Sequence, residues 1–288
     1  MKQLNIKHLR IYMILLFLFL LAAGIGIPRL RYLSEASRLT KDTVRLAEFR
    51  SQPMPGKEMG DLSEILTELR CADSPGELLG IYWLESSFGQ EKTGKSLEEG
   101  RENRKRWETN PAWSAYLSAC CAVWDDLEYF PVAQEDPEGA LNVTFEDSWM
   151  YGRSYKGERG HEGTDLMPET SERGYYPIVS ITDGTVESMG WLELGGWRIG
   201  IRAPRGGYFY YAHLDSYADL EVGDSVKAGD LLGFMGDTGY SKVEGTTGNF
   251  PVHLHLGIYI NYEGEEISVN PYPALKYVED RRVSMVHR

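Results

Sequence analysis

The sequence is poor in cysteine and in net positive charge. Its three cysteines, Cys71, Cys120 and Cys121, are too few for a disulfide-stapled fold. One bond from Cys71 to the adjacent pair would fit an oxidising compartment, but packing of Cys120 in a helix core is the simpler interpretation. Thirty Lys and Arg against 43 Asp and Glu leave a formal net charge of −13. Because nucleic-acid binding needs clustered basic residues, that class of function is excluded.

An uncharged apolar run lies near the N-terminus. Residues 11–27, "IYMILLFLFLLAAGIGI", form a run just long enough to cross a bilayer as a helix, and Pro28 ends the run. We expect residues 1–30 to form a cytoplasmic tip and a single-pass signal anchor in the cell membrane, with the rest of the chain outside the cytoplasm. The alternative is secretion after signal cleavage, since "AAG" at 22–24 resembles a processing site.

Residues 31–135 are expected to form a small α-helical, membrane-proximal region. Ser74-Pro75-Gly76-Glu77 is a capping box that opens one helix. A second helix begins near Asn110, and its apolar residues recur at helical spacing: Trp113, Tyr116, Leu117, Cys120, Trp124 and Leu127. Glu85 in "ESSF" weakly resembles the catalytic acid of lytic transglycosylases, but the end of an amphipathic helix is the preferred interpretation.

Residues 141–275 have a different pattern. Glycine-rich turns separate short alternating or β-branched segments such as "WRIGIRAP", "YFYYAHL" and "VHLHLGIYI". This pattern predicts a mainly β domain with an antiparallel sheet. Residues 276–288 would follow it as a C-terminal tail.

Two of the six histidines are one residue apart in "VHLHLG", residues 252–257. Successive side chains of a strand point to opposite faces, so His253 and His255 share one face while Leu254 and Leu256 share the other. Paired histidines on one face of a strand suit a metal site, although H-x-H alone is a weak signal. The interpretation therefore depends on further ligands.

Two more histidines lie in distinctive surroundings. His161 and Asp165 are four residues apart in "GHEGTD", where the glycines argue against a helix. In "YFYYAHLD", strand alternation predicts that Phe209, Tyr211 and His213 share one face. Three short histidine-containing motifs thus follow one another in the β region.

These motifs are HxGxD from residue 161, YxHL from residue 211 and HxH from residue 253. In that order they resemble the lysostaphin-type (LytM-like) peptidoglycan zinc metalloendopeptidases. Residues 220–239, "LEVGDSVKAGDLLGFMGDTG", are similar to a hairpin and turn of that family. The resemblance covers residues 141–275 and does not extend to the helical region.

The resemblance implies that His161, Asp165 and His255 bind Zn²⁺, and that His213 and His253 are catalytic histidines outside the ligand set. Three N and O ligands leave a fourth tetrahedral position open, which is typical of catalytic rather than structural zinc. One neutral histidine can then act as a general base, and the other can stabilise an oxyanion or protonate the leaving amine.

We therefore expect a zinc metalloendopeptidase that hydrolyses peptide bonds in peptidoglycan stems or cross-bridges by metal-activated water. Its partners would be the peptidoglycan peptide and, through the N-terminal helix, the lipid bilayer. The alternatives are a catalytically silent cell-envelope scaffold of the same fold and a protease acting on an envelope protein. The complete ligand set favours an enzyme. Residues 240–251, "YSKVEGTTGNFP", are expected to form a long loop at the cleft edge.

Overall fold

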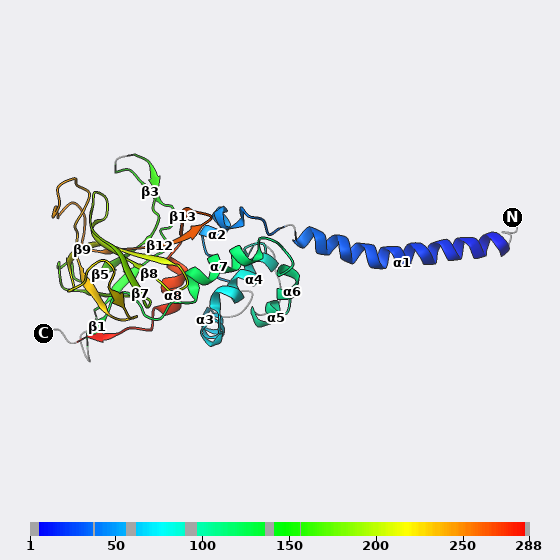
Figure 1. The fold of residues 1–288 in the computed structure, drawn as a ribbon, viewed down its shortest axis with the longest axis horizontal. Coiled ribbons are helices and arrows are strands. Elements are labelled where there is room, and N and C mark those ends of the chain that lie inside the picture. The colour runs from blue at the N-terminus through cyan, green and yellow to red at the C-terminus, as the bar shows by residue number, and fades with distance from the viewer. Residues whose placement is uncertain are drawn as a thin grey trace.

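Figure 1 shows the computed structural model, which describes residues 6–285 apart from residues 37, 56–61, 90–96, 136–140 and 156. A long helix leads into a small helical region and then a larger β region. The helices are α1 (Ile6–Ala36), the 3-10 helix η1 (Thr43–Arg45), α2 (Ala47–Arg50), α3 (Leu62–Cys71), α4 (Pro75–Glu85), α5 (Leu97–Arg101), α6 (Arg104–Trp107), α7 (Trp113–Trp124) and α8 (Tyr272–Val278). The strands are β1 (Gln134–Glu135), β2 (Val143–Phe145), β3 (Gly152–Arg153), β4 (Arg159–Gly160), β5 (Thr164–Pro168), β6 (Pro177–Val179), β7 (Gly184–Leu192), β8 (Gly196–Arg202), β9 (Tyr208–Tyr217), β10 (Ser225–Val226), β11 (Leu231–Met235), β12 (Leu254–Tyr262), β13 (Glu265–Val269) and β14 (Ser284–Met285).

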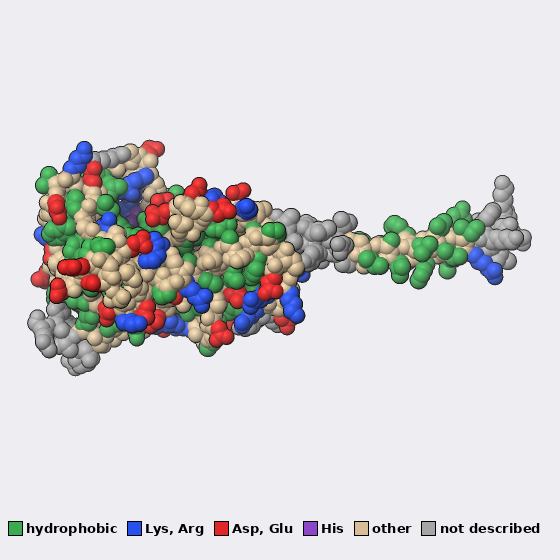
Figure 2. All heavy atoms as spheres, in the orientation of Figure 1, with side chains coloured by type: hydrophobic (Ala, Val, Ile, Leu, Met, Phe, Trp, Pro, Cys, Tyr) green, Lys and Arg blue, Asp and Glu red, His purple; other side chains and the backbone are tan. Residues whose placement is uncertain are grey.

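Helix α1 projects away from the rest of the molecule (Figure 1). Its segment Arg10–Ile27 has a mean hydropathy of 2.3, and 0% of that segment is buried. Apolar side chains follow the visible face of the helix (Figure 2). The helix is therefore long and apolar enough to cross a membrane. Pro28 ends the apolar run but not the helix, which continues to Ala36.

The capping box predicted at the start of α4 is present. Ser74 has an extended backbone, and its Oγ accepts a hydrogen bond from the backbone N–H of Glu77 at 3.1 Å. Pro75 occupies the first turn, where its missing N–H leaves no helical bond unmade. The side chain of Ser74 thus satisfies one of the free donors at the helix start.

The carboxylate of Glu85, at the end of α4, is held by hydrogen bonds to neighbouring side chains. Its carboxylate accepts hydrogen bonds from Trp107 Nε1 at 2.7 Å and from Asn103 Nδ2 at 3.0 Å. Arg106 lies 3.4 Å from the same carboxylate. These contacts tie α4 to α6, in agreement with the structural interpretation of Glu85.

The large β-sheet has the strand order β10-β7-β8-β9-β12-β5-β2, and each pairing along it is antiparallel. Strand β9 lies on one side of β12, while β5 and β13 pair with successive parts of its other side. Strand β11 links β9 to β6. The expected antiparallel β domain is confirmed, and β12 lies near its centre.

The chain after residue 275 packs against the β region. Helix α8 continues to Val278, and β14 pairs in parallel with β1, placing Ser284 opposite Gln134. The segment expected to be a tail from residue 276 therefore contains regular structure up to Met285.

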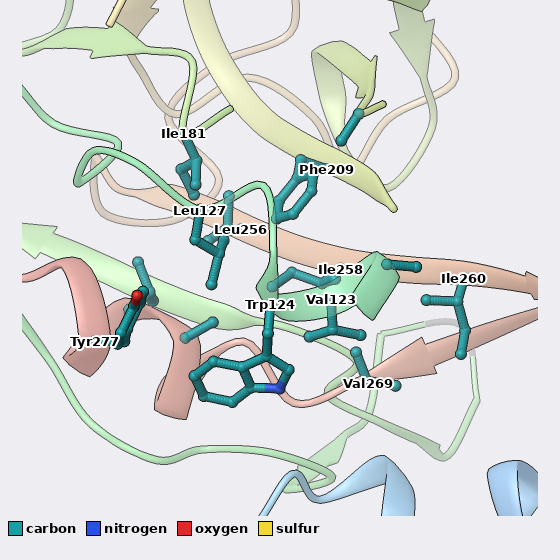
Figure 3. Close-up of a cluster of buried hydrophobic side chains, with 14 of the residues drawn as sticks. Val123, Trp124, Leu127, Ile181, Phe209, Leu256, Ile258, Ile260, Val269 and Tyr277 are labelled. Atoms are coloured by element: carbon teal, nitrogen blue, oxygen red, sulfur yellow. The ribbon is translucent and has the colours of Figure 1, made fainter. Parts of the chain in front are cut away.

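The helical region and the sheet share one hydrophobic core (Figure 3). Trp124 of α7 is 1% exposed and packs edge-on against Tyr277 of α8, with the ring centroids 5.9 Å apart. Helix α7 packs against the face of β12 that carries Leu256, Ile258 and Ile260 (Figure 3). Because alternate residues of β12 face the cleft, the helical region supports the back of the strand that carries His255.

The three cysteines are free. Cys120 is fully buried in α7, and burial raises the pKa of its thiol well above the ordinary value. Burial likewise raises the pKa of Cys121 to about 11. Cys71 is exposed at the end of α3. The interpretation of Cys120 as a core residue is therefore confirmed.

Candidate metal centre

Three side chains converge where β5 and β12 lie side by side. His255 of β12 is directly opposite Asp165 of β5, and His161 lies in the loop just before β5. His161 Nε2 is 3.0 Å from Asp165 Oδ1 and 3.1 Å from His255 Nδ1, and the last two atoms are 3.0 Å apart. The register of one antiparallel pair therefore brings together residues that are 90 positions apart in the sequence.

This donor set fits a zinc ion. Tetrahedral Zn²⁺ with bonds of about 2.0–2.2 Å holds its ligand atoms roughly 3.3–3.6 Å apart, close to the edges of this triangle. His161 Nδ1 lies 3.0 Å from the Oγ and 3.3 Å from the carbonyl oxygen of Ser148. Because a carbonyl oxygen only accepts, the Nδ1–H of His161 donates there and its Nε2 keeps the lone pair. That lone pair, a carboxylate oxygen and a second imidazole nitrogen meet at one point.

Gly163 lies directly against the imidazole ring of His255. A Cβ atom at this position would lie 2.3 Å from Cε1 and 2.5 Å from Nε2 of His255. Both distances are far below a van der Waals contact, so a side chain here would displace the His255 ring. The glycine of HxGxD therefore leaves room for the imidazole on the neighbouring strand.

The carboxylate of Asp165 is ionised. Burial opposes its charge, but the adjacent His161 and His255 imidazoles outweigh burial and hold the pKa of Asp165 well below its ordinary value. Its second oxygen, Oδ2, accepts a hydrogen bond from the Arg153 guanidinium at 2.5 Å. Asp165 thus presents the charged form that binds metal ions.

His213 faces the cleft because β9 contains a bulge. Its φ is +63°, and the ladder with β8 shifts register between Tyr211 and Leu214. The extra residue turns the His213 side chain onto the cleft face, where Tyr210 also lies, while Tyr211 is fully buried in the core. The prediction that His213 shares a face with Phe209 and Tyr211 is therefore wrong, because simple alternation does not hold across a bulge.

His213 and His253 lie beside the three converging side chains of His161, Asp165 and His255. Each of these two histidines has one ring nitrogen that is not used in a hydrogen bond to the backbone. The Nδ1–H of His213 donates to the carbonyl of Thr238 at 2.8 Å, and that of His253 donates to the carbonyl of Pro251 at 2.7 Å. A neutral imidazole has one N–H, so each Nε2 keeps its lone pair. His253 Nε2 lies 3.7 Å from Asp165 Oδ1. Burial lowers the pKa of both histidines, which favours this neutral form.

The five residues open into a cleft of about 960 Å³. One edge is aromatic: Phe250 packs against His213 with ring centroids 4.6 Å apart, and Tyr240 packs against Phe250 at 4.8 Å. Tyr155, from the β3–β4 connection, stacks on Tyr240 at 4.6 Å and donates its hydroxyl to the Tyr240 carbonyl. The loop expected at the cleft edge, residues 240–251, is therefore confirmed there.

Sequence reasoning missed three residues of this site. Ser148 orients His161, Arg153 neutralises part of the charge of Asp165, and the ring of Tyr210 lies 6.2 Å from that of His255. Ser148 and Arg153 lie outside the motifs, and no local pattern marks them. The alternation of "YFYYAH" would have marked Tyr210 as a cleft residue only if the bulge had been known.

Two family comparisons cover most of the body of the chain. Residues 159–271 match Peptidase family M23, and residues 34–126 match the family described as LytM, N-terminal domain. The family resemblance thus extends into the helical region, which corrects the expectation that it begins at residue 141. A solved structure of lytM from Ruminococcus gnavus is 47% identical, with a TM-score of 0.79 over 88% of this chain and 99% of that chain.

Curated relatives align with about half of this chain. The L-Ala–D-Glu endopeptidase of Bacillus subtilis is 40% identical over 136 residues, which are 47% of this chain and 40% of that protein. The glycyl-glycine endopeptidase ALE-1 of Staphylococcus capitis is 30% identical over 148 residues, 50% of this chain and 37% of that protein. The alignments therefore span less than half of each of these relatives. Taken with the match to the whole R. gnavus chain, they show that this chain belongs to peptidase family M23, the family of the lysostaphin-type endopeptidases.

Proposed function

We propose that this chain is a zinc endopeptidase that hydrolyses peptide bonds in peptidoglycan. The observation that carries the proposal is the convergence of two imidazole nitrogens and one carboxylate oxygen within 3.1 Å of one another, beside two further neutral histidines in an open cleft. Membership of a peptidase family agrees with this chemistry. Among relatives, one is named for an L-Ala–D-Glu bond and another for a glycyl-glycine bond, and both bonds are candidates here.

The residues divide into ligands and proton carriers. His161 Nε2, Asp165 Oδ1 and His255 Nδ1 would hold the zinc ion. When bound, zinc supplies a Lewis acid and lowers the pKa of water from 15.7 to about 7. His213 and His253 present unprotonated Nε2 atoms, which accept a proton and return it to the leaving amine. Their Nδ1–H bonds to backbone carbonyls keep both rings oriented during that exchange.

The direct test is digestion of purified peptidoglycan by the full-length protein in detergent micelles with one equivalent of zinc. We expect soluble muropeptides with new amino termini, identified by mass spectrometry. The matched control is Asp165→Asn, which keeps the side-chain shape but removes the charge, and it should release none. A zinc-loaded wild-type protein that releases no peptide would instead favour the silent scaffold or a protease of an envelope protein.

We further propose that α1 anchors the protein in the cell membrane, with residues 31–135 as the membrane-proximal region and residues 141–275 as the catalytic region outside the cytoplasm. The exposed apolar surface of α1 supports this arrangement. The site lies in the sheet, far from α1 in Figure 1, which leaves the cleft open to the cell wall.

The anchor predicts a location for the full chain in cells. It should stay in the membrane pellet after alkaline carbonate extraction, keep its N-terminal segment, and be digested by protease added to spheroplasts. A double substitution, Leu16→Arg with Leu20→Arg, changes two exposed side chains of α1 and should prevent stable insertion, since each arginine at mid-span costs about 2.5–3.5 kcal/mol. A mature chain that begins near residue 25 and is found in the medium would establish secretion instead.

A further inference from the structure

Arg198 of β8 is a cleft residue with buried, unused hydrogen-bond donors. It lies between Trp197 and the fully buried Ile199, and alternation along β8 turns its side chain to the cleft, which it lines. Its Nε and one terminal guanidinium nitrogen are buried and have no acceptor within the described part of the chain. An unsatisfied buried charged donor is costly, so a ligand that supplies acceptors here would be bound favourably.

Three of the carboxylates that line the cleft already have other partners, while Glu193 and Glu266 line it as well. Asp165 is paired with Arg153, Glu162 with Arg50 at 2.8 Å and Glu187 with Arg202 at 2.6 Å. Arg198 has no ion pair among the described residues. Its guanidinium therefore brings to the cleft a positive charge that forms no ion pair with a described carboxylate, in a chain whose formal net charge is −13.

The position of Arg198 relative to the candidate metal centre follows from strand register. Asp165 pairs with His255, and His255 pairs with Ala212 on β9. The bulge next to Ala212 faces Arg198 on β8, because Ile199 is opposite Tyr211. The four positions thus form one row across neighbouring strands. Two strand spacings of about 4.8 Å put the Arg198 backbone roughly 10 Å from that of His255.

Between the two points the row is covered by the side chain of Tyr210, because a Cβ atom at Gly195 would lie 2.1 Å from its hydroxyl oxygen and 3.4 Å from the Ala212 methyl carbon. A peptide bound across the row would lie over this ring. The methyl group of Ala212 is the side chain nearest the middle of the row, and the Tyr210 ring borders it at 6.2 Å from the ring of His255. An extended peptide advances about 3.3–3.6 Å per residue, and an arginine side chain shortens the gap further. A group bound by Arg198 would thus belong to a residue next to the scissile bond or one position beyond.

We propose that Arg198 binds a free carboxylate on the substrate, and that this chain therefore selects an acidic stem peptide over a glycine cross-bridge. The inference rests on the proposed function and names the substrate class of the same site. Guanidinium is the side-chain group best suited to carboxylates, because its donors match two oxygens. A glutamyl residue has two carboxyl groups and uses at most one to continue the chain, so it keeps one free, whereas a glycine bridge offers none.

The test compares two synthetic peptides that differ at one group. One contains L-Ala–D-Glu, and the other contains L-Ala–D-Gln, in which a carboxamide replaces the carboxylate. Binding to the zinc-free, full-length protein is measured by calorimetry, so the result does not depend on turnover. We expect the wild type to bind the acidic peptide at least about tenfold more tightly, as for a hydrogen-bonded charge pair. Arg198→Gln should bind both peptides alike.

The matched control is Arg202→Gln, on the same strand, which removes the same charge from a guanidinium that is already paired with Glu187. It should keep the wild-type preference. The inference is overturned if Arg198→Gln still prefers the acidic peptide, or if Arg202→Gln loses the preference equally. Hydrolysis of peptidoglycan with no preference for the acidic peptide would remove this inference and leave the proposed function standing. Arg198-dependent binding of the acidic peptide without hydrolysis of peptidoglycan would support this inference and contradict the proposed function.

Discussion

His255→Ala is expected to lose its bound zinc and all measurable hydrolysis of peptidoglycan. Its Nδ1 is one of the three converging donors, and two remaining protein ligands do not hold zinc at a catalytic site. The loss of affinity should exceed the roughly 10- to 100-fold that follows from substituting an outer hydrogen-bond partner. Zinc content by mass spectrometry and peptide release are measured on the same preparation.

The fold should survive this substitution. The His255 side chain lies in the cleft, while Leu254 and Leu256 on the other face of β12 are fully buried and remain in place. Unfolding midpoints close to that of the wild type would show that the loss of zinc is local. A His255→Ala protein that keeps stoichiometric zinc would refute the ligand assignment.

His253→Ala is the matched control at the residue just before β12. Its Nε2 lies 3.7 Å from Asp165 Oδ1, outside the close triangle, so zinc should be retained while turnover falls by about 10²- to 10⁴-fold. His213→Asn should behave in the same way. Asparagine is preferable to alanine there, because the φ of +63° favours residues that tolerate the left-handed region. If His253→Ala loses zinc as fully as His255→Ala, both histidines are ligands.

Trp124→Ala is expected to destabilise the whole body of the protein by about 3–5 kcal/mol, the usual cost of truncating a buried tryptophan. Trp124, the last residue of α7, is 1% exposed and packs against β12 and α8 (Figure 3). Its Nε1 also donates to the fully buried Gln52 side chain at 2.7 Å, and loss of that donor leaves an unsatisfied acceptor. Denaturant unfolding in detergent, followed by tryptophan fluorescence and circular dichroism, measures the change.

Trp124→Phe separates the two contributions. It keeps a ring in the core but removes the N–H donor, so it should cost about 1–3 kcal/mol plus a smaller packing loss. The shared core predicts that the helical and β regions unfold in one transition. Two separate transitions, with Trp124→Ala moving only one of them, would contradict a common core.

The periodic parts of the molecule could be predicted because their causes are local. The antiparallel β domain follows from short alternating segments between glycine turns, and the start of α4 follows from Ser74 and Pro75. On β12, alternation correctly separated His255 from Leu254 and Leu256. On β9 the same rule failed at His213, because one inserted residue reverses the direction of every side chain that follows it.

The sequence by itself determined the apolar length of α1, the order of the histidine motifs and the antiparallel character of the sheet, since each depends on residues that are neighbours along the chain. Only the tertiary structure decided that Arg153 meets Asp165, that Arg198 shares a row with His255, and that Trp124 packs behind the same strand. These contacts depend on strand register, a bulge and the docking of α7. Such features are set by packing among distant residues, and no local pattern encodes them.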